Sequence, residues 1–184
     1  MSAPRRDPFD KQIQNRNYLS DVGFKFSLAK APKVDFFSNT ATLPGLTLGV
    51  VNQPSYLKEI PLPGDRLVYD DFELTFIVDE ELENWMAIHN WMRGLGFPNS
   101  IGDFISEVTN EDGLVERERQ YSDGTLIVLN NQFNSVARVK FTDLFPVSLS
   151  ALRFDATNQD YQTITATATF KYLIYNVELV TRTT

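Results

Sequence analysis

The chain has no cysteine and only one histidine among its 184 residues. Disulfide bonds and thiolate metal sites are therefore excluded. One histidine without cysteine cannot build a common zinc site, because a metal-bound histidine needs further ligands and a supporting partner. We therefore expect His89 to be a packed or rim side chain, and we expect no metal and no cofactor.

Long apolar runs are also absent. No stretch approaches the roughly 20 apolar residues that a membrane-spanning helix requires, so no spanning segment is expected. The first residues, MSAPRRDPFDKQIQNRN, are polar and lack the apolar core of a secretory signal. We expect residues 1–19 to form a flexible, locally basic arm, either disordered or ordered on a neighbouring subunit.

The overall charge and composition favour a β-rich protein that does not grip nucleic acid. The formal net charge is −7, whereas phosphate binding requires a surplus of lysine and arginine. Fourteen phenylalanines and seven tyrosines suit pleated, half-buried surfaces. The length suggests one domain, and we see no internal repeat or linker, so residues 20–184 are expected to form a single β domain.

Sequence signatures of catalysis are missing. No G-x-S-x-G elbow occurs, and Gly94–Gly96 follows a predicted helix instead of the strand that a dinucleotide fingerprint needs. Asn110–Gly113 lacks the ligand spacing of a calcium loop. A glycosidase pair could hide among the carboxylates, although strand-edge charge and a helix start are the simpler interpretation. These carboxylates are Asp70, Asp71, Glu73, Asp79, Glu80, Glu81 and Glu83. We predict no enzyme; a carbohydrate-active or lectin-like β-sandwich is the alternative from another class.

Several short segments show the alternation of half-buried strands. Residues 21–29 and 71–78 have the clearest pattern. Further strands are expected at residues 34–42, 46–51, 125–129, 136–141 and 147–154. Pro44–Gly45 predicts a type II turn and Pro63–Gly64 another turn, because glycine tolerates a positive φ. The prolines in Ile60–Pro63 place that piece at a sheet edge or in a loop.

One amphipathic helix follows the strand at 71–78. Asp79 is its expected N-cap, and Gly94 its expected stop. The residues that recur at helical spacing on its predicted apolar face are Leu82, Trp85, Met86, His89 and Met92. Trp91 falls off this face, so we predict that Trp91 contacts another chain. Phe97 and the Leu43–Gly45 segment are further candidates for a subunit interface.

The end of the chain predicts one strand of about twelve residues, twice the ordinary length. Its polar face carries Thr163, Thr165, Thr167, Thr169 and Lys171, and the four threonines are the candidate lumen-facing residues. Two interpretations remain open for this face: the solvated outside of a β-sandwich, or the wall of a water-filled lumen in a ring. The irregular stretch at residues 96–124 is expected to be a long contact loop.

Several segments together resemble a known family. They are Thr42–Leu46, Pro63–Arg66, Tyr69–Leu74, the helix start from Val78 through Trp91, Phe141–Val147 and Leu152–Phe154. Over residues 20–178 the chain resembles the tail tube proteins of contractile-tailed bacteriophages, or the similar tube-initiator module of a baseplate. A type VI secretion-like ring protein is a related alternative.

The resemblance implies two packed antiparallel sheets with one flanking helix, and six copies that close into a β-barrel ring. Rings would stack into a tube through which DNA passes without specific binding. The implied partners are further copies of the chain and the tail sheath, baseplate and tape-measure proteins. The implied location is the virion tail, assembled in the host cytoplasm. On this basis Asp65 and Arg66 join the expected interface, and we hypothesise that surplus negative charge lines the lumen and repels DNA phosphates.

Overall fold

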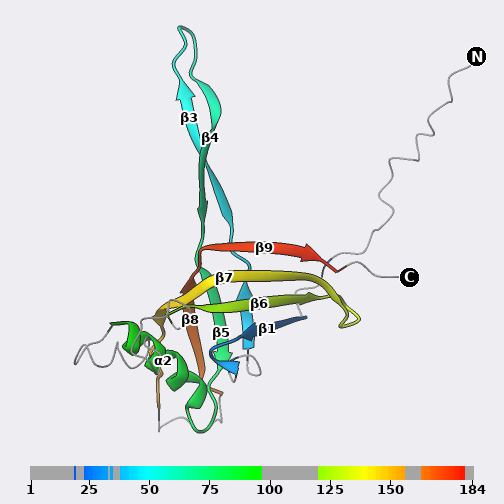
Figure 1. Ribbon diagram of the computed structural model, residues 1–184, viewed down its shortest axis with the longest axis vertical. Helices are drawn as coiled ribbons and strands as arrows, with labels where there is room; N and C mark the ends of the chain where they lie inside the picture. The colour runs from blue at the N-terminus through cyan, green and yellow to red at the C-terminus, as the bar shows by residue number, and fades with distance from the viewer. Residues whose placement is uncertain are drawn as a thin grey trace, which may run out of the picture.

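The chain forms two antiparallel β-sheets that share one long strand, one helix and a projecting two-stranded ribbon (Figure 1). The computed structural model describes residues 19, 23–32, 34, 38–96, 120–155 and 163–180. The predicted fold class, mainly β with two antiparallel sheets and one flanking helix, is confirmed. The predicted arm at 1–19, apart from Leu19, and most of the predicted loop at 96–124 lie outside the described residues, although Gly96 closes the helix and Ser122–Gly124 belong to a strand.

Sheet A contains four strands in the order β1-β6-β7-β9. Their bounds are β1 Phe24–Leu28, β6 Ser122–Leu129, β7 Ser135–Leu149 and β9 Ile174–Leu179. The connection from β6 to β7 is closed by Asn130, whose Oδ1 accepts hydrogen bonds from the backbone N–H groups of Gln132 and Asn134. This side-chain turn explains why the chain breaks between the strands predicted at 125–129 and 136–141.

Sheet B has the order β7-β8-β5-β2. Its further strands are β8 Thr165–Lys171, β5 Phe72–Ile77 and β2 Ser38–Thr42. The strand β5 shows the expected alternation, with Phe72, Leu74 and Phe76 buried. The strand predicted at 34–42 is confirmed for Ser38–Thr42, but its predicted start is wrong, because the Val34 N–H closes a turn onto the Ala31 carbonyl.

The shared strand β7 replaces two predicted strands. Its first part pairs with β6 and β9, and Phe145–Leu149 pair with β8. At the change of sheet Asp143 has a φ of 55°, and the register to β6 shifts opposite it. Such a bulge adds twist and bends a strand. The expected separate strand at 147–154 is therefore wrong: its first residues continue β7, and residues 150–155 are not strand.

The predicted twelve-residue strand at the end of the chain is also wrong. The chain leaves β8 after Lys171 and starts β9 at Ile174, so the two halves lie in different sheets. The corner is held by the Leu173 N–H, which donates to the Thr142 carbonyl at 3.0 Å. Both β7 and the β8–β9 connection thus pass between the sheets at the same place.

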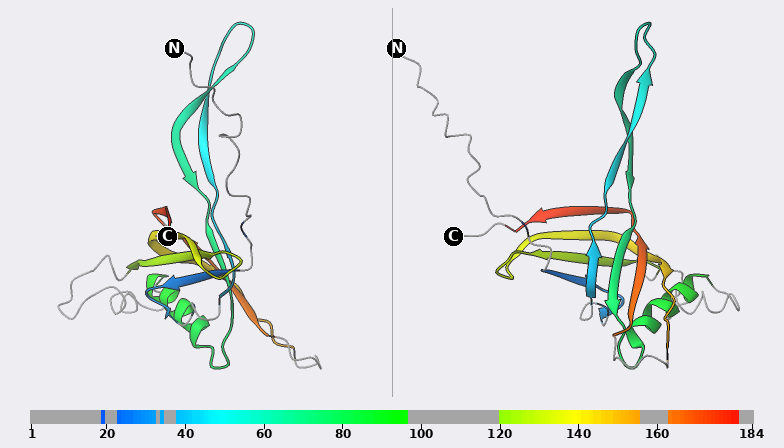
Figure 2. Two further views of the ribbon diagram at one scale, coloured as in Figure 1. Left: turned by 90° about the vertical axis from the view of Figure 1, so that its right-hand side faces the viewer. Right: turned by 180° about the vertical axis from the view of Figure 1, so that it is seen from behind.

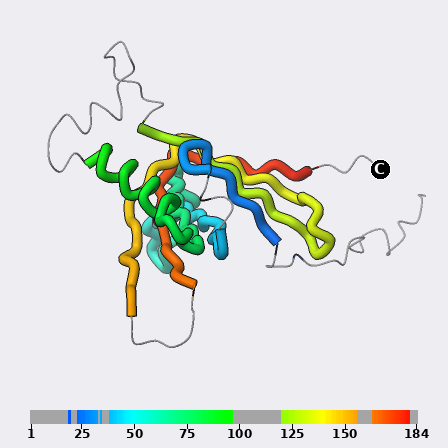
Figure 3. The backbone as a smooth tube through the Cα atoms, turned by 90° about the horizontal axis from the view of Figure 1, so that it is seen from below, coloured from blue at the N-terminus to red at the C-terminus, as the bar shows by residue number. Residues whose placement is uncertain are grey.

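The core between the sheets is built from phenylalanines. The ring of Phe72 lies 5.1 Å from that of Phe26, 4.7 Å from Phe141 and 6.1 Å from Phe170, measured between centroids. Helix α2, Glu83–Gly96, packs beside β7 and the lower part of sheet B (Figure 3). Aromatic rings in tilted contact fill such a core densely.

The predicted N-cap is displaced: α2 begins at Glu83, so Leu82 holds the N-cap position, although Asp79 Oδ1 still accepts the backbone N–H of Glu83 at 2.8 Å. The predicted apolar face is correct only in part: Trp85 and Met92 pack against the core while half-buried, but the centre of the buried face lies elsewhere. The buried residues of the helix are Asn84, Ile88, Trp91 and Gly94, and Met86 is exposed.

The reason for this rotation is the polar residue Asn84. Its amide donates to the Ile77 carbonyl at 2.8 Å, and its Oδ1 accepts from the Asp79 N–H at 3.3 Å. A buried amide must be paired, so these bonds turn Asn84 inward and fix the helix around it. Gly94 is consequently an interior helix residue, and the predicted stop there is wrong because the helix continues to Gly96.

One long hairpin runs from sheet B into the projecting ribbon (Figure 2). Strands β3, Leu46–Gln53, and β4, Ile60–Tyr69, form a separate antiparallel pair. The register of Thr42 opposite Glu73 in sheet B continues unchanged as Leu46 opposite Tyr69. We call residues 46–69 the β3–β4 ribbon; its strands pair only with each other among the described strands.

Candidate assembly surfaces

The β3–β4 ribbon exposes apolar side chains on both of its faces. The exposed apolar residues are Leu46, Leu48, Val50, Val51, Ile60, Leu62, Leu67 and Val68. At its tip Tyr56 is 101% exposed and Leu57 92% exposed. Monomeric proteins rarely expose contiguous apolar patches of this kind unless the patch binds a partner. The ribbon is therefore the first candidate surface for contact with another chain.

Two glycines allow the strands of the ribbon to approach closely. A Cβ on Gly64 would lie 2.7 Å from the Gly49 carbonyl oxygen, which is closer than a carbon atom can come. At this point the register shifts between Leu48 and Val50, so the ribbon carries a bulge. The predicted turn at Pro63–Gly64 is wrong, since both residues lie inside β4. The predicted edge position of Ile60–Pro63 is confirmed, because β4 has a partner on one side only.

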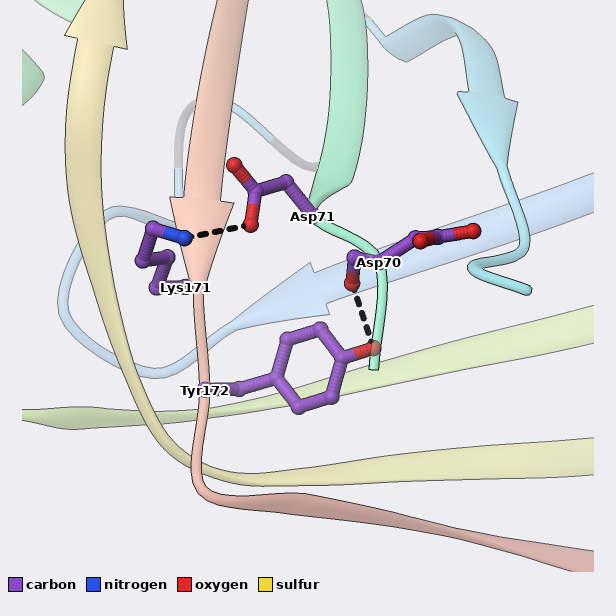
Figure 4. A network of polar contacts seen from close by, with 4 residues as sticks. All are labelled: Asp70, Asp71, Lys171 and Tyr172. Carbon is purple, nitrogen blue, oxygen red and sulfur yellow. Dashed lines mark hydrogen bonds and ion pairs between the residues drawn. The ribbon is translucent and has the colours of Figure 1, made fainter. Parts of the chain in front are cut away.

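The root of the ribbon is surrounded by three tyrosines, Tyr69, Tyr172 and Tyr175, which we call the root cluster. The Tyr172 hydroxyl donates to the Asp70 carbonyl at 2.8 Å (Figure 4). The Tyr175 hydroxyl donates to the Pro44 carbonyl at 3.2 Å. Both legs of the ribbon are thus held by tyrosines of the β8–β9 corner.

Charge surrounds this cluster as well. Lys171 Nζ lies 2.8 Å from Asp71 Oδ1, joining the end of β8 to the start of β5. Partial burial raises the pKa of the Tyr172 hydroxyl above its usual value of about 10, and nearby Tyr175, Asp70 and Asp71 raise this pKa further. The hydroxyl therefore stays protonated and remains a hydrogen-bond donor.

The outward face of sheet B is rich in hydroxyl groups, and we call it the hydroxyl face. Thr165 is exposed, and Thr167 and Thr169 are half-buried, while the alternate residues of β8 are buried in the core. Thr167 and Thr75 share a hydrogen bond of 3.0 Å between their Oγ1 atoms.

The hydroxyl face runs across all four strands of sheet B. One row places Ser148, Thr169, Glu73 and Thr42 on adjacent strands, and another places Thr167, Thr75 and Thr40. Glu73 is the one charged side chain in these two rows. The face is thus polar and weakly acidic, while Thr163 lies just before β8 and is exposed.

The predicted interface residues of the hairpin lie in two places, at the root of the ribbon and within strand β4. Leu43, Pro44 and Gly45 form the unpaired link between β2 and β3, and Pro44 is buried there. Gly45 has no positive φ, so the predicted type II turn is wrong; a Cβ at this position would instead lie 2.7 Å from Asp70 Oδ2. Asp65 and Arg66 are exposed on β4 of the ribbon.

The two predicted aromatic contacts do not lie on the described surface. Trp91 is only 3% exposed, and its Nε1 donates to the Gln120 carbonyl at 3.1 Å. Trp91 is part of the core of its own chain, because the rotation of α2 turns it inward. Phe97 lies outside the described residues.

The single histidine behaves as a packed rim residue, as predicted. His89 stacks on Trp85 with ring centroids 5.0 Å apart and an interplanar angle of 16°. Within the described ranges, no three His, Cys, Asp or Glu side chains gather in a way that could hold a metal ion. No helix in the described part of the chain is long and apolar enough to cross a membrane.

Comparison with known proteins identifies the family. A family model for the phage tail tube protein matches residues 8–178. The chain belongs to the phage tail tube protein family. The resemblance drawn from the sequence is thereby confirmed, and this tail tube protein is a structural component of a phage tail.

Relatives of this tail tube protein include components that end a tube. The tail tube terminator protein of enterobacteria phage T4 is 27% identical over 169 residues, covering 88% of this chain and 90% of the relative. The tube-terminating cap of the anti-feeding prophage has the same fold, with a TM-score of 0.63 and 14% identity over 95% of this chain and 100% of that one. A chain of the anti-feeding prophage baseplate has a TM-score of 0.60 and 14% identity over 90% and 97%.

Sequence reasoning missed two of the surfaces above. Leu46–Val51 was expected as an ordinary short strand, although its pairing with Ile60–Tyr69 leaves both faces apolar and unburied. The sequence does carry a signal for this surface: Val50 and Val51 are consecutive, so they place apolar side chains on both faces of the strand. The root cluster carried no local signal, because Tyr69 and Tyr172 lie far apart in the chain and meet only at the sheet corner.

Proposed function

We propose that this tail tube protein assembles as a closed ring of six copies at an end of the tail tube of a contractile-tailed phage. The relationship to the T4 tail tube terminator protein over nearly the whole of both chains supports the terminal position. The apolar, unpartnered β3–β4 ribbon is the observation that carries the assembly role, because such a surface requires a partner.

The free strands of sheet B support ring closure. Among the described strands, β2 pairs only with β5, and Phe145–Leu149 of β7 pair only with β8. Exposed sheet edges are prone to aggregate unless they are paired. In the proposed ring, β2 of one copy joins the end of β7 of the next, so that six sheets close into one barrel.

The hydroxyl face lines the bore of this proposed barrel. Thr165, Thr167 and Thr169 present neutral hydroxyls, and Glu73 of each copy adds a negative charge. Lys171 continues the same face of β8, but its ammonium group is paired with Asp71, so the wall carries no surplus positive charge and DNA passes through without specific binding. In this proposal α2 faces away from the bore, toward the tail sheath, and baseplate and tape-measure proteins are further partners.

The ribbon contacts a second copy of this chain in the proposal. Leu43, Gly45, Asp65 and Arg66 stay in the proposed interface, whereas Trp91 is removed from it because it is buried in its own chain. A ribbon that extends from one copy onto the next buries its apolar faces there and enlarges the contact area between the two subunits.

Light scattering after gel filtration tests the ring. We expect a discrete particle of six times the 21.0 kDa chain mass, visible as rings in the electron microscope. Extended tubes formed by the protein alone would move the assignment from a terminal ring to the stacked rings of the tube itself. A monomer at every concentration would overturn the proposal and favour the lectin-like alternative.

Variants at the tip of the ribbon test its contact with a second copy. Changing Tyr56 and Leu57 to serine should abolish the ring while leaving the subunit folded. The control is Phe133→Ser, which removes another exposed aromatic residue, 71% exposed, from the β6–β7 turn at a different part of the molecule. Ring loss with the control alone, or with neither variant, would contradict the role of the ribbon.

A further inference from the structure

We propose that Tyr172 and Tyr175 are positioning residues that fix the direction in which the β3–β4 ribbon leaves the two sheets. The inference rests on the proposed function in one respect: the fixed direction is what presents the ribbon to a neighbouring copy. The ribbon pairs with no other described strand, so its direction depends on what holds its root.

Each leg of the ribbon is held by one tyrosine hydroxyl. Tyr172 donates to the carbonyl of Asp70, the residue that follows β4, and Tyr175 donates to the carbonyl of Pro44, which lies just before β3. The two legs are also tied to each other, because the Asp70 N–H donates to the Gly45 carbonyl at 3.2 Å. Swinging the ribbon about its root would break the two tyrosine bonds.

Aromatic contacts continue from the ribbon into the core. The ring of Tyr69, the last residue of β4, meets Tyr172 at 6.0 Å and Tyr175 at 5.7 Å, both edge-on. Those two rings pack on Phe141 at 5.1 and 5.8 Å, and Phe141 contacts Phe72 in the core. An unbroken set of rings therefore links the root of the ribbon to the buried core.

The position of the tyrosines relates the ribbon to both sheets. Tyr172 and Tyr175 flank the corner where the chain passes from β8 to β9. The Leu173 N–H binds Thr142 of β7, next to the bulge that carries β7 from sheet A to sheet B. The Lys171–Asp71 ion pair lies beside the cluster (Figure 4). The tyrosines thus anchor the ribbon at the junction of the two sheets.

The decisive experiment measures the direction of the ribbon in the full chain. Since the protein has no cysteine, Gln53→Cys at the end of β3 and Ser27→Cys on the exposed face of β1 give two unique sites for spin labels. Double electron–electron resonance on samples diluted with unlabelled protein then reports the ribbon-to-sheet distance. The test variant combines Tyr172→Phe and Tyr175→Phe, which removes two hydroxyls and keeps both rings.

A single narrow distance in the parent protein and a broad distribution in the double variant would support the proposal. The control is Tyr69→Phe, because the Tyr69 hydroxyl makes no hydrogen bond to a described residue; its distribution should stay narrow. An equally narrow distribution in the double variant would overturn the proposal. Circular dichroism verifies that all variants retain the fold.

Ring formation separates this inference from the proposed function. Loss of two typical hydrogen bonds at the root should lower the ring association constant about tenfold. A broadened distribution of ribbon-to-sheet distances together with an unchanged ring yield would overturn the positioning role. If even the parent protein formed no ring, the proposed function would fail, whereas the effect of the hydroxyls on ribbon direction would still be measured.

Discussion

The lower and upper halves of one hairpin have the same strand geometry and opposite environments. In the lower half, the apolar side chains of β5, Phe72, Leu74 and Phe76, are buried in the core. In β3 and β4, residues of the same chemical kind are exposed on both faces. The register runs through both halves without a break at the root. The difference teaches that this chain completes only half of its hairpin by itself and leaves the other half to be covered in an assembly.

The largest effect on the free energy of unfolding is expected in the lower half. Phe72→Ala removes the ring that contacts Phe26, Phe141 and Phe170. Truncating a buried phenylalanine costs about 3–5 kcal/mol. Urea unfolding followed by tryptophan fluorescence measures the change. A loss below about 1 kcal/mol would show that the centre of the core lies elsewhere.

A smaller effect is expected at the bulge of the ribbon. Gly64→Ala places a methyl group against the Gly49 carbonyl, so the strands must separate at a cost of about 1–3 kcal/mol to the local pairing. The matched variant Gly49→Ala meets its nearest atom at 3.4 Å and should cost less. Hydrogen exchange of the β3 and β4 amides compares the two. Equal protection in both variants would refute the close approach.

Alkaline pH should loosen the root of the ribbon. The pKa of Tyr172 is raised in the folded chain, so the folded state holds a proton that the unfolded chain releases near pH 10. This contribution to stability is complete below about pH 10 and is lost as the pH rises above that value. Tyr172→Phe should flatten this part of the pH profile of urea unfolding. An unchanged alkaline slope in the variant would assign the effect to other tyrosines.

The smallest effect on subunit stability is expected in the exposed half of the ribbon. Changing Val50 and Val51 to threonine keeps β-branched side chains on a surface that the isolated subunit leaves in water. The free energy of unfolding of the monomer should change by less than about 0.5 kcal/mol. Ring yield should fall strongly. A large loss of monomer stability would mean that the ribbon folds back onto its own chain.

The sequence predicted those elements whose pattern is local. The strand Phe72–Ile77 alternates cleanly because one face is buried, and the acidic side chain of Asp79 binds the first backbone N–H of the helix that follows. The fold class followed from such patterns, and the family from the resemblance of several segments. They needed no knowledge of which segments meet in space.

The parts that could not be predicted depend on contacts between distant residues. Asn84 turns α2 by binding the end of β5, which no helical periodicity reports. Position 64 has no room for a side chain, because the Gly49 carbonyl lies against it. From the sequence, Pro63–Gly64 had suggested a turn instead. The break between β8 and β9 follows from the bend of β7 at Asp143. In each case a local rule was overruled by tertiary structure.

The continuous strand β7 has a mechanical consequence. Because Ser135–Leu149 belong to both sheets, a load placed on one sheet travels to the other along covalent bonds instead of across a packed interface. Adjacent strands run alongside it in both sheets, so their hydrogen bonds would be sheared together rather than unzipped one by one. A subunit built in this way transmits thrust along its length without its two layers sliding apart.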